Sequence, residues 1–207
     1  TGQVTTVTEP SGTTIVTEKQ RDGQLASITG TAGVPRYYQY GIETNGDGWT
    51  RIDFGSPSST VWTVDVRDRT GRTIRRERPG YGGTVLTNRY EYDAEGRLLK
   101  ESATGQPDRL FEYDARGEVF RSGLDVNDNG QLDPASMDRI NEQIQRYVED
   151  GGGWYQETIQ AIYPQDGSGQ AVTTAVSRVR TGGSSCGCAQ GYREETDIHG
   201  QTTVHHT

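Results

Sequence analysis

The chain has 207 residues, of which only 30% are hydrophobic and 28 are glycines, and its net charge at pH 7 is -8. Such an acidic chain lacks the basic face that contacts to nucleic-acid phosphates need, and it has no apolar run near the roughly 20 residues of a membrane-spanning helix. Its 11 Tyr and 3 Trp residues stand in alternating runs rich in Thr and Val, which argues against disorder and predicts a sheet that buries mainly one face.

The N-terminal half of the chain consists of short alternating runs separated by turn residues. Residues 1–34 predict two or three strands, and residues 37–54 predict a hairpin rich in aromatic side chains. The corner Asp68–Gly71 joins two further runs, at 62–67 and 72–78. Other turn residues fit the same role, at Glu9–Gly12, Asp22–Gly23, Asn45–Gly48, Pro79–Gly83, Asp166–Gly169 and Asp197–Gly200.

The clearest repeat lies at residues 88–123. The run Y-E-Y-D-A-E-G-R-L at 90–98 returns as F-E-Y-D-A-R-G-E-V at 111–119. Each copy is an alternating run, a D-A-x-G corner and a second run, which is typical of a β-hairpin. The Asp side chain can accept hydrogen bonds from the turn backbone, and the Gly can take the positive φ that closes the turn. From Gly48, the corner glycines recur at 71, 96 and 117, which indicates one hairpin per repeat.

This pattern resembles the YD repeat of the RHS family, most clearly over 88–123, less over 37–87 and slightly elsewhere. The resemblance implies an all-β fold over residues 1–207, with antiparallel hairpins laid side by side in one extended, coiling sheet. In bacterial members of the family, that sheet forms a shell around a toxin domain or part of a large secreted or surface protein. The resemblance therefore implies a secreted or cell-surface bacterial protein. It also implies that the tyrosines of the repeat are packing residues of the sheet and do not contact a ligand.

The second informative stretch is D-V-N-D-N-G-Q-L-D at 125–133, which matches the front of an EF-hand loop and resembles the calcium loop of dockerin modules. Side-chain oxygens stand at loop positions 1, 3, 5 and 9, with Gly at position 6 and the Gln131 carbonyl at position 7. Because a hard cation takes six to eight oxygens, this spacing predicts a Ca²⁺ site in an insertion at 123–138.

The predicted calcium loop departs from the motif at its end. Position 12 is Ser136 instead of an acid, and Asp138 supplies the last ligand if the loop is longer than usual. The alternative is an acidic turn that binds nothing. The predicted metal ligands are Asp125, Asn127, Asn129, Gln131, Asp133 and Asp138.

The segment after the loop admits two interpretations. Met137, Ile140, Ile144, Tyr147 and Val148 have the spacing of a helix face, but Ile140, Ile144 and Val148 also share one face of a strand. We favour a strand, because a Gly-rich turn at 151–153 then leads into an alternating run at 154–163. A further strand is predicted at 171–180.

No catalytic constellation stands out in the sequence. Cys186 and Cys188 are too few ligands for zinc, and a bridge between them would be strained. In an oxidising compartment they would cross-link two chains, and an inert pair of thiols is the alternative. His199 falls at a predicted hairpin tip, and His205 and His206 lie near the end of the chain. We expect no enzymatic activity, because no nucleophile stands beside a base and no phosphate loop or H-E-x-x-H motif occurs.

The sequence therefore predicts a non-catalytic, calcium-stabilised structural protein outside the cytoplasm. Edge strands at 1–8 and 201–207 need partners, so we expect copies of the chain, or flanking repeats of a longer chain, to add to them and form a filament. Because Thr1 is not an initiation residue, we expect a processed product or a segment of a longer protein. One alternative is a fragment of a toxin-encapsulating shell or adhesin. Another is a glycan-binding module with an aromatic platform of Tyr37, Tyr38, Tyr40, Trp49 and Trp62.

Overall fold

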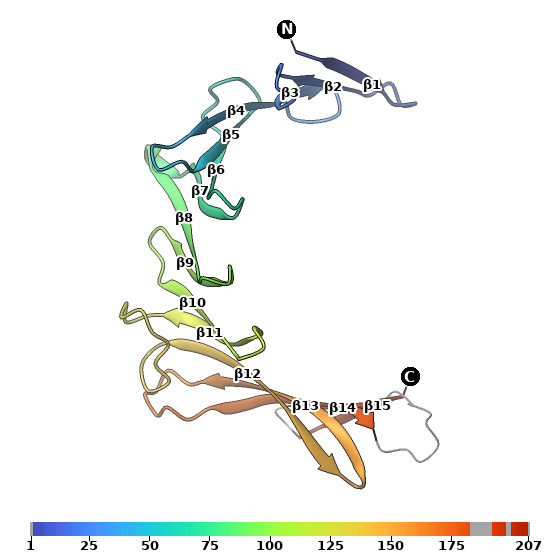
Figure 1. Ribbon diagram of the computed structural model, residues 1–207, viewed down its shortest axis with the longest axis vertical. Helices are drawn as coiled ribbons and strands as arrows, with labels where there is room; N and C mark the ends of the chain where they lie inside the picture. Colours follow the sequence, from blue (N-terminus) through green and yellow to red (C-terminus); the bar gives the residue numbers. More distant parts are fainter. Residues whose placement is uncertain (1, 183–191, 198–199, 207) are drawn as a thin grey trace. The chain divides into compact units, whose positions relative to one another are not determined.

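The computed structural model describes residues 2–182, 192–197 and 200–206. Within them, sixteen strands form one antiparallel sheet in which the order of the strands in space is their order in the sequence (Figure 1). The sheet is open, because β1 and β16 each pair with one neighbour. The prediction of an all-β sheet built from antiparallel hairpins is confirmed. The described residues include no α-helix, so none that is long and apolar enough to cross a membrane.

Contacts between residues divide the chain into two compact units, which are described separately. Unit 1 comprises Thr1–Glu91 and Glu101–Gln106, and unit 2 comprises Tyr92–Lys100 and Pro107–Thr207. Unit 1 holds most of β8 (Val85–Tyr92), the second half of β9 (Leu98–Ala103) and the 3₁₀ turn η1 (Tyr81–Gly83). Its other strands are β1 (Val4–Thr8), β2 (Thr14–Lys19), β3 (Leu25–Gly30), β4 (Arg36–Ile42), β5 (Gly48–Phe54), β6 (Trp62–Arg67) and β7 (Thr73–Pro79).

Unit 1 buries one face around a small core. Val66 and Asp53 have no exposed surface, and the strand register places them opposite Trp49 and Trp62 respectively. Residues paired across strands share a face, so the two indole rings flank the buried groups. The Asp53 carboxylate is paired at 2.9 Å with the guanidinium of Arg51, two residues away on the same face. A buried charge is tolerated at this position because it is paired.

Unit 2 contains the longest strands of the chain. Its strands are β10 (Asp108–Tyr113), β11 (Val119–Asp125), β12 (Arg139–Asp150), β13 (Gly153–Tyr163), β14 (Val172–Gly182), β15 (Tyr192–Asp197) and β16 (Thr202–His206). β12 and β13 make a long hairpin, drawn in yellow to orange in Figure 1. The two residues of its turn, Gly151 and Gly152, have φ values of 56° and 77°. Two positive φ values in a two-residue turn give the twist that suits a hairpin. The strand prediction after the loop is confirmed, and the helical alternative is wrong.

The apolar core of unit 2 lies where the loop between β11 and β12 folds back on the sheet. Leu132 of that loop packs with Leu110 of β10 and Ile140 of β12, and Tyr163 of β13 lies against this cluster. Gly123 of β11 makes the packing possible, because a Cβ there would lie 2.5 Å from the Arg139 carbonyl oxygen and 3.1 Å from Leu132 Cδ2. The insertion is therefore part of the core.

One turn differs from its predicted position. The corner glycine between β4 and β5 is Gly46, with φ of 92°, whereas Gly48 is the first residue of β5. The Gly46 amide donates to the Glu43 carbonyl at 2.9 Å, which is the hydrogen bond that the other corner glycines make. The N-G-D-G run offers two glycines for the corner. Gly46 is the corner glycine because its amide is the one that donates to the Glu43 carbonyl.

Candidate functional site

The repeated corner is one backbone structure, which occurs six times among the residues that the structure describes. In each corner, an amide donates to the carbonyl four residues later, and the glycine amide donates back to the first carbonyl at 2.9–3.1 Å. The strand register shifts by one residue just before three of them, at Lys19, Arg67 and Tyr113. A tight turn that ends in a glycine of left-handed conformation, followed by a bulge, is a common hairpin connection. This turn explains why the glycine always stands three residues after the first residue of the corner. The corners begin at Glu9, Gln20, Glu43, Asp68, Asp93 and Asp114.

An Asp at the first position adds a second layer of hydrogen bonds to the corner. The carboxylates of Asp68, Asp93 and Asp114 each accept the amide four residues later, at 3.0, 2.8 and 2.9 Å. In the corner that begins at Asp93, the later residue is Arg97, and its Nε also donates a hydrogen bond to the Asp93 carboxylate at 2.6 Å. In the last corner the position is Glu118, and Arg116 pairs with Asp114 instead, at 3.1 Å. This accounts for the D-x-x-G-R pattern.

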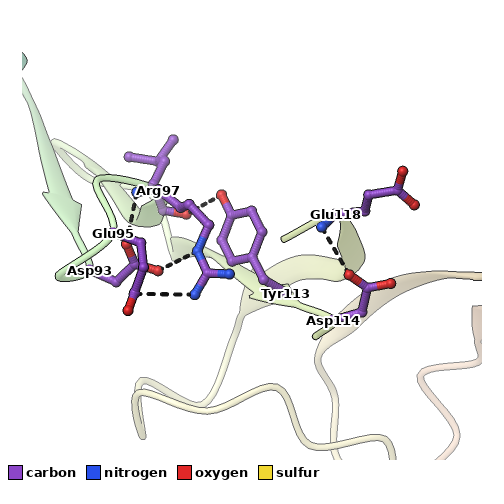
Figure 2. A network of polar contacts seen from close by, with 7 residues as sticks. Asp93, Glu95, Arg97, Tyr113, Asp114 and Glu118 are labelled. Carbon is purple, nitrogen blue, oxygen red and sulfur yellow. Dashed lines mark hydrogen bonds and ion pairs between the residues drawn. The ribbon is translucent and has the colours of Figure 1, made fainter. Parts of the chain in front are cut away.

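The Tyr of the repeat joins one hairpin to the next. Figure 2 shows Tyr113, the residue before the second corner, reaching back to the first: its hydroxyl donates to the Leu98 carbonyl at 2.7 Å. The Arg97 guanidinium lies 4.7 Å from the centre of the Tyr113 ring, within the range of a cation–π contact. Tyr, Asp and Arg thus form one network of contacts across two hairpins.

These contacts favour the ionised carboxylates. Hydrogen bonds from the Glu118 amide and from Arg116 lower the pKa of Asp114 below its usual value. Burial alone would raise the pKa of Asp93, but hydrogen bonds from the amide and side chain of Arg97 outweigh it and lower the pKa. The side chain of Thr70, followed by Arg72, lowers the pKa of Asp68. Corner aspartates are therefore anions throughout the neutral range.

The predicted calcium loop is organised by its own side chains. Asp125 Oδ1 and Asn127 Oδ1 both accept the Asn129 amide, at 3.1 and 3.2 Å, so loop positions 1 and 3 converge. Asp125 Oδ2 accepts the Gly130 amide at 2.7 Å, and Gly130 has φ of 79°. The side chain of Asn129 also binds Asp133 Oδ2, at 2.6 Å. Gly130 makes the sharp turn, as predicted from its position.

Asp138 closes the loop from its far end. Its two carboxylate oxygens accept the Val126 and Asp133 amides at 2.8 and 2.9 Å, and the side chain is fully buried. Burial by itself would raise the pKa of Asp138, but these two amides outweigh it and lower the pKa. Ser136, at position 12, donates to the Asp133 carbonyl and accepts the Asp138 amide. Asp138 thus clamps both ends of the loop by way of the backbone.

The loop fits a hard cation in part. Asp125 and Asn127 bring oxygens together at its start, and every carboxylate oxygen that accepts one amide keeps a second lone pair. The buried Asp138 carboxylate points at backbone amides in the described arrangement. Among the residues that the structure describes, no three His, Cys, Asp or Glu side chains are grouped to hold a metal. The ligand set at the loop start is thus carboxylate and amide oxygen, which suits Ca²⁺ chemically.

A buried ion pair in unit 2 was not anticipated from the sequence. Glu157 of β13 is fully buried, and its carboxylate oxygens accept Arg146 Nε of β12 at 2.5 Å and Arg178 Nε of β14 at 2.8 Å. The predicted turn at 151–153 would pair position 146 with 158. Gly153 instead belongs to β13, and the two-residue turn at Gly151 and Gly152 pairs Arg146 with Glu157.

The predicted aromatic platform is divided between the two faces of the sheet. Tyr37 pairs with Asp53 and lies on the face of the two tryptophans, whereas Tyr38 and Tyr40 alternate to the opposite face. All five rings are half-buried. The observation gives the glycan-binding alternative at this place no support. Cys186, Cys188 and His199 lie outside the described residues, as do the side chains of His205 and His206.

Comparison with models of known protein families gave no match, and comparison with curated proteins gave no significant relative.

Proposed function

We propose that this chain is a non-catalytic structural protein, an array of YD-repeat-like hairpins that is stabilised by calcium and extends edge to edge into a longer assembly. The observation that carries the proposal is the strand order, in which every strand pairs only with its sequence neighbours. In such an array each hairpin supports the next, and any strand of the same kind can continue the sheet.

The exposed N-terminal edge supports extension. All five residues of β1 are exposed. Within the described part of the chain, β1 pairs with β2 alone, so one row of its backbone amides and carbonyls has no strand partner there. Its V-T-T-V-T sequence has no charge or proline, the residues that usually block edge pairing. A matching strand from a second copy, or from a flanking repeat of a longer chain, would satisfy that edge by β-augmentation.

The polar groups of the corners support an architectural role. Asp, Arg and Tyr of the repeat form hydrogen bonds with the turn backbone and with the preceding hairpin, as in Figure 2. Such side chains define the spacing of hairpins. The resemblance to YD repeats agrees with this role, and from it we propose a secreted or cell-surface location in a bacterium.

Ca²⁺ is the proposed ligand of the loop between β11 and β12. Asp125, Asn127, Asn129 and Asp133 would offer side-chain oxygens and Gln131 its carbonyl, while Asp138 holds the two loop ends together. The loop carries Leu132 into the core of unit 2, so a cation bound there would stabilise the packing of three strands.

Calcium is expected to raise the thermal stability of the protein. At a concentration about 100 times its Kd, a ligand that binds only the folded state adds about 2.7 kcal/mol to the free energy of unfolding. Differential scanning calorimetry in calcium and in chelator measures the shift. Asp125→Asn should remove most of it. Asp22→Asn is the matched control, since the Asp22 carboxylate accepts the Gln24 amide at 3.0 Å in a turn of unit 1, and it should keep the shift. Equal melting temperatures with and without calcium would contradict the proposed site.

Edge-to-edge assembly is expected to depend on β1. Lysines introduced by Thr5→Lys and Val7→Lys should reduce self-association, because charge on an edge strand disfavours pairing with another strand. Sedimentation velocity and negative-stain microscopy would report fibres or ordered oligomers for the native chain and smaller species for the variant. Tyr81→Lys places the same charge on a fully exposed residue away from the edge and should change nothing. A native chain that is monomeric at every concentration would exclude assembly from identical copies.

A further inference from the structure

The two faces of β12, β13 and β14 in unit 2 differ in charge. Residues paired across strands share a face, so Arg146, Glu157 and Arg178 lie together on one side. On the other side, Gln143 pairs with Gln160 and Gln145 pairs with Thr158. We call this side the neutral face and define its centre by Gln143, Gln145, Gln156, Thr158, Gln160 and Ser177. Charged residues border this centre: Glu149 at the hairpin tip, Glu195 on β15, and Asp114, Arg116 and Glu118 at the corner before β11.

Three adjoining hollows open on the neutral face. One of about 370 Å³ is lined by Phe120, Gln143 and Gln160, among others. A second of about 340 Å³ shares Gln160 with it and continues over Thr158 and Ser177. A third of about 190 Å³ shares Phe120 and Gln143 with the first and reaches the corner that begins at Asp114. The shared residues show that these hollows form one shallow, branched depression across β11 to β16.

Two exposed aromatic rings stand at the tip end of the same face. Tyr147 pairs with Gln156, and Trp154 pairs with Glu149, so both rings belong to the neutral face by register. Tyr147 is 62% exposed and Trp154 is 51% exposed. Exposed aromatic rings favour contact with a partner, so these two rings extend the neutral face toward the hairpin tip.

We propose that the neutral face binds an uncharged oligosaccharide or polysaccharide. A glutamine side chain donates and accepts hydrogen bonds, and a sugar hydroxyl does both as well, so the amide strip matches a row of hydroxyls. Trp154 and Tyr147 offer apolar ring faces on which the C–H face of a hexose packs. The six residues that define the centre carry no charge. The two arginines that line the hollows, Arg116 and Arg121, are each paired with two carboxylates, so the face disfavours acidic ligands. This site lies in unit 2, apart from the divided aromatics of unit 1, and stands independently of calcium binding and assembly.

Isothermal titration of the full chain with uncharged hexasaccharides tests the proposal, using those of cellulose, amylose, laminarin and mannan as probes. At least one should bind. Gln143→Ala and Gln160→Ala should each weaken the affinity about fivefold, the effect of one lost hydrogen bond. Trp154→Ala should weaken it by a similar factor, about fivefold, through lost stacking. Tyr81→Ala removes a fully exposed ring from unit 1 and should leave the affinity unchanged.

Three results would overturn the assignment. The first is that none of the four sugars binds at millimolar concentration. The second is an affinity that survives Gln143→Ala and Gln160→Ala together, provided that circular dichroism shows both variants folded. The third is that these substitutions abolish self-association of the chain in sedimentation velocity without any sugar binding, which would assign the face to a second copy.

Discussion

Ile140→Ala is expected to lower the free energy of unfolding of unit 2 by about 2–5 kcal/mol, the range for truncating a large buried aliphatic side chain. Ile140 is 2% exposed and belongs to one buried cluster with Leu110 of β10 and Leu132 of the loop. Because the sheet is a single layer, few other groups can move in to fill the cavity. Removing Ile140 should therefore loosen the loop as well as the strand.

Urea unfolding followed by circular dichroism measures this loss, and two variants calibrate it. Ile140→Val removes one methylene and should cost about 0.5–1.5 kcal/mol. Ile162→Ala truncates an isoleucine of β13 that is well exposed, and its effect should be smaller than that of Ile140→Ala. Equal losses for the buried and the exposed isoleucine would show that the Leu110, Leu132 and Ile140 cluster is not the core of unit 2.

Glu157→Gln is the second large effect, with an expected loss of about 2–3 kcal/mol. Breaking a buried ion pair costs about 3–5 kcal/mol when the remaining charge stays buried. The side chains of Arg146 and Arg178 are 57% and 34% exposed, so water recovers part of their solvation and the loss falls below that range. Glu149→Gln, at an exposed position of β12, is the matched control and should be nearly neutral.

The same residue predicts the direction of the pH dependence. Burial would raise the pKa of Glu157, but hydrogen bonds and charge from Arg178 and Arg146 outweigh it, so the folded pKa lies below the usual value of about 4.3. Its stabilisation is thus complete above about pH 5 and is lost as the pH falls through the folded pKa. The urea midpoint of the native chain should fall with acid below that pH, and the fall should be shallower for Glu157→Gln. Parallel curves would show that Glu157 does not contribute to acid unfolding.

Much of the fold could be predicted because its rules are local. The D-x-x-G corner defines a turn between two antiparallel strands, so Asp93 and Asp114 could be identified as turn residues without any tertiary information. The N-G-D-G run offered two possible corners, and the prediction used Gly48 where the turn uses Gly46. The loop at 125–138 could be predicted to curl at Gly130, since oxygens at positions 1 and 3 accept amides from within the loop.

The sequence by itself determined the alternation of residues along each strand and the D-x-x-G corners, because these depend on neighbours in the chain. It left the register of the β12–β13 hairpin open, because three glycines follow Asp150 and the turn uses only Gly151 and Gly152. Only the tertiary structure decided which residues come into contact across a long loop or beyond a bulge. Asp138 turns to the Val126 and Asp133 amides, Leu132 folds onto Ile140, and a bulge near Gln160 sets which β14 residue meets Glu157. Those contacts join residues whose relative position depends on the packing between strands, and packing is not a property of any short stretch of sequence.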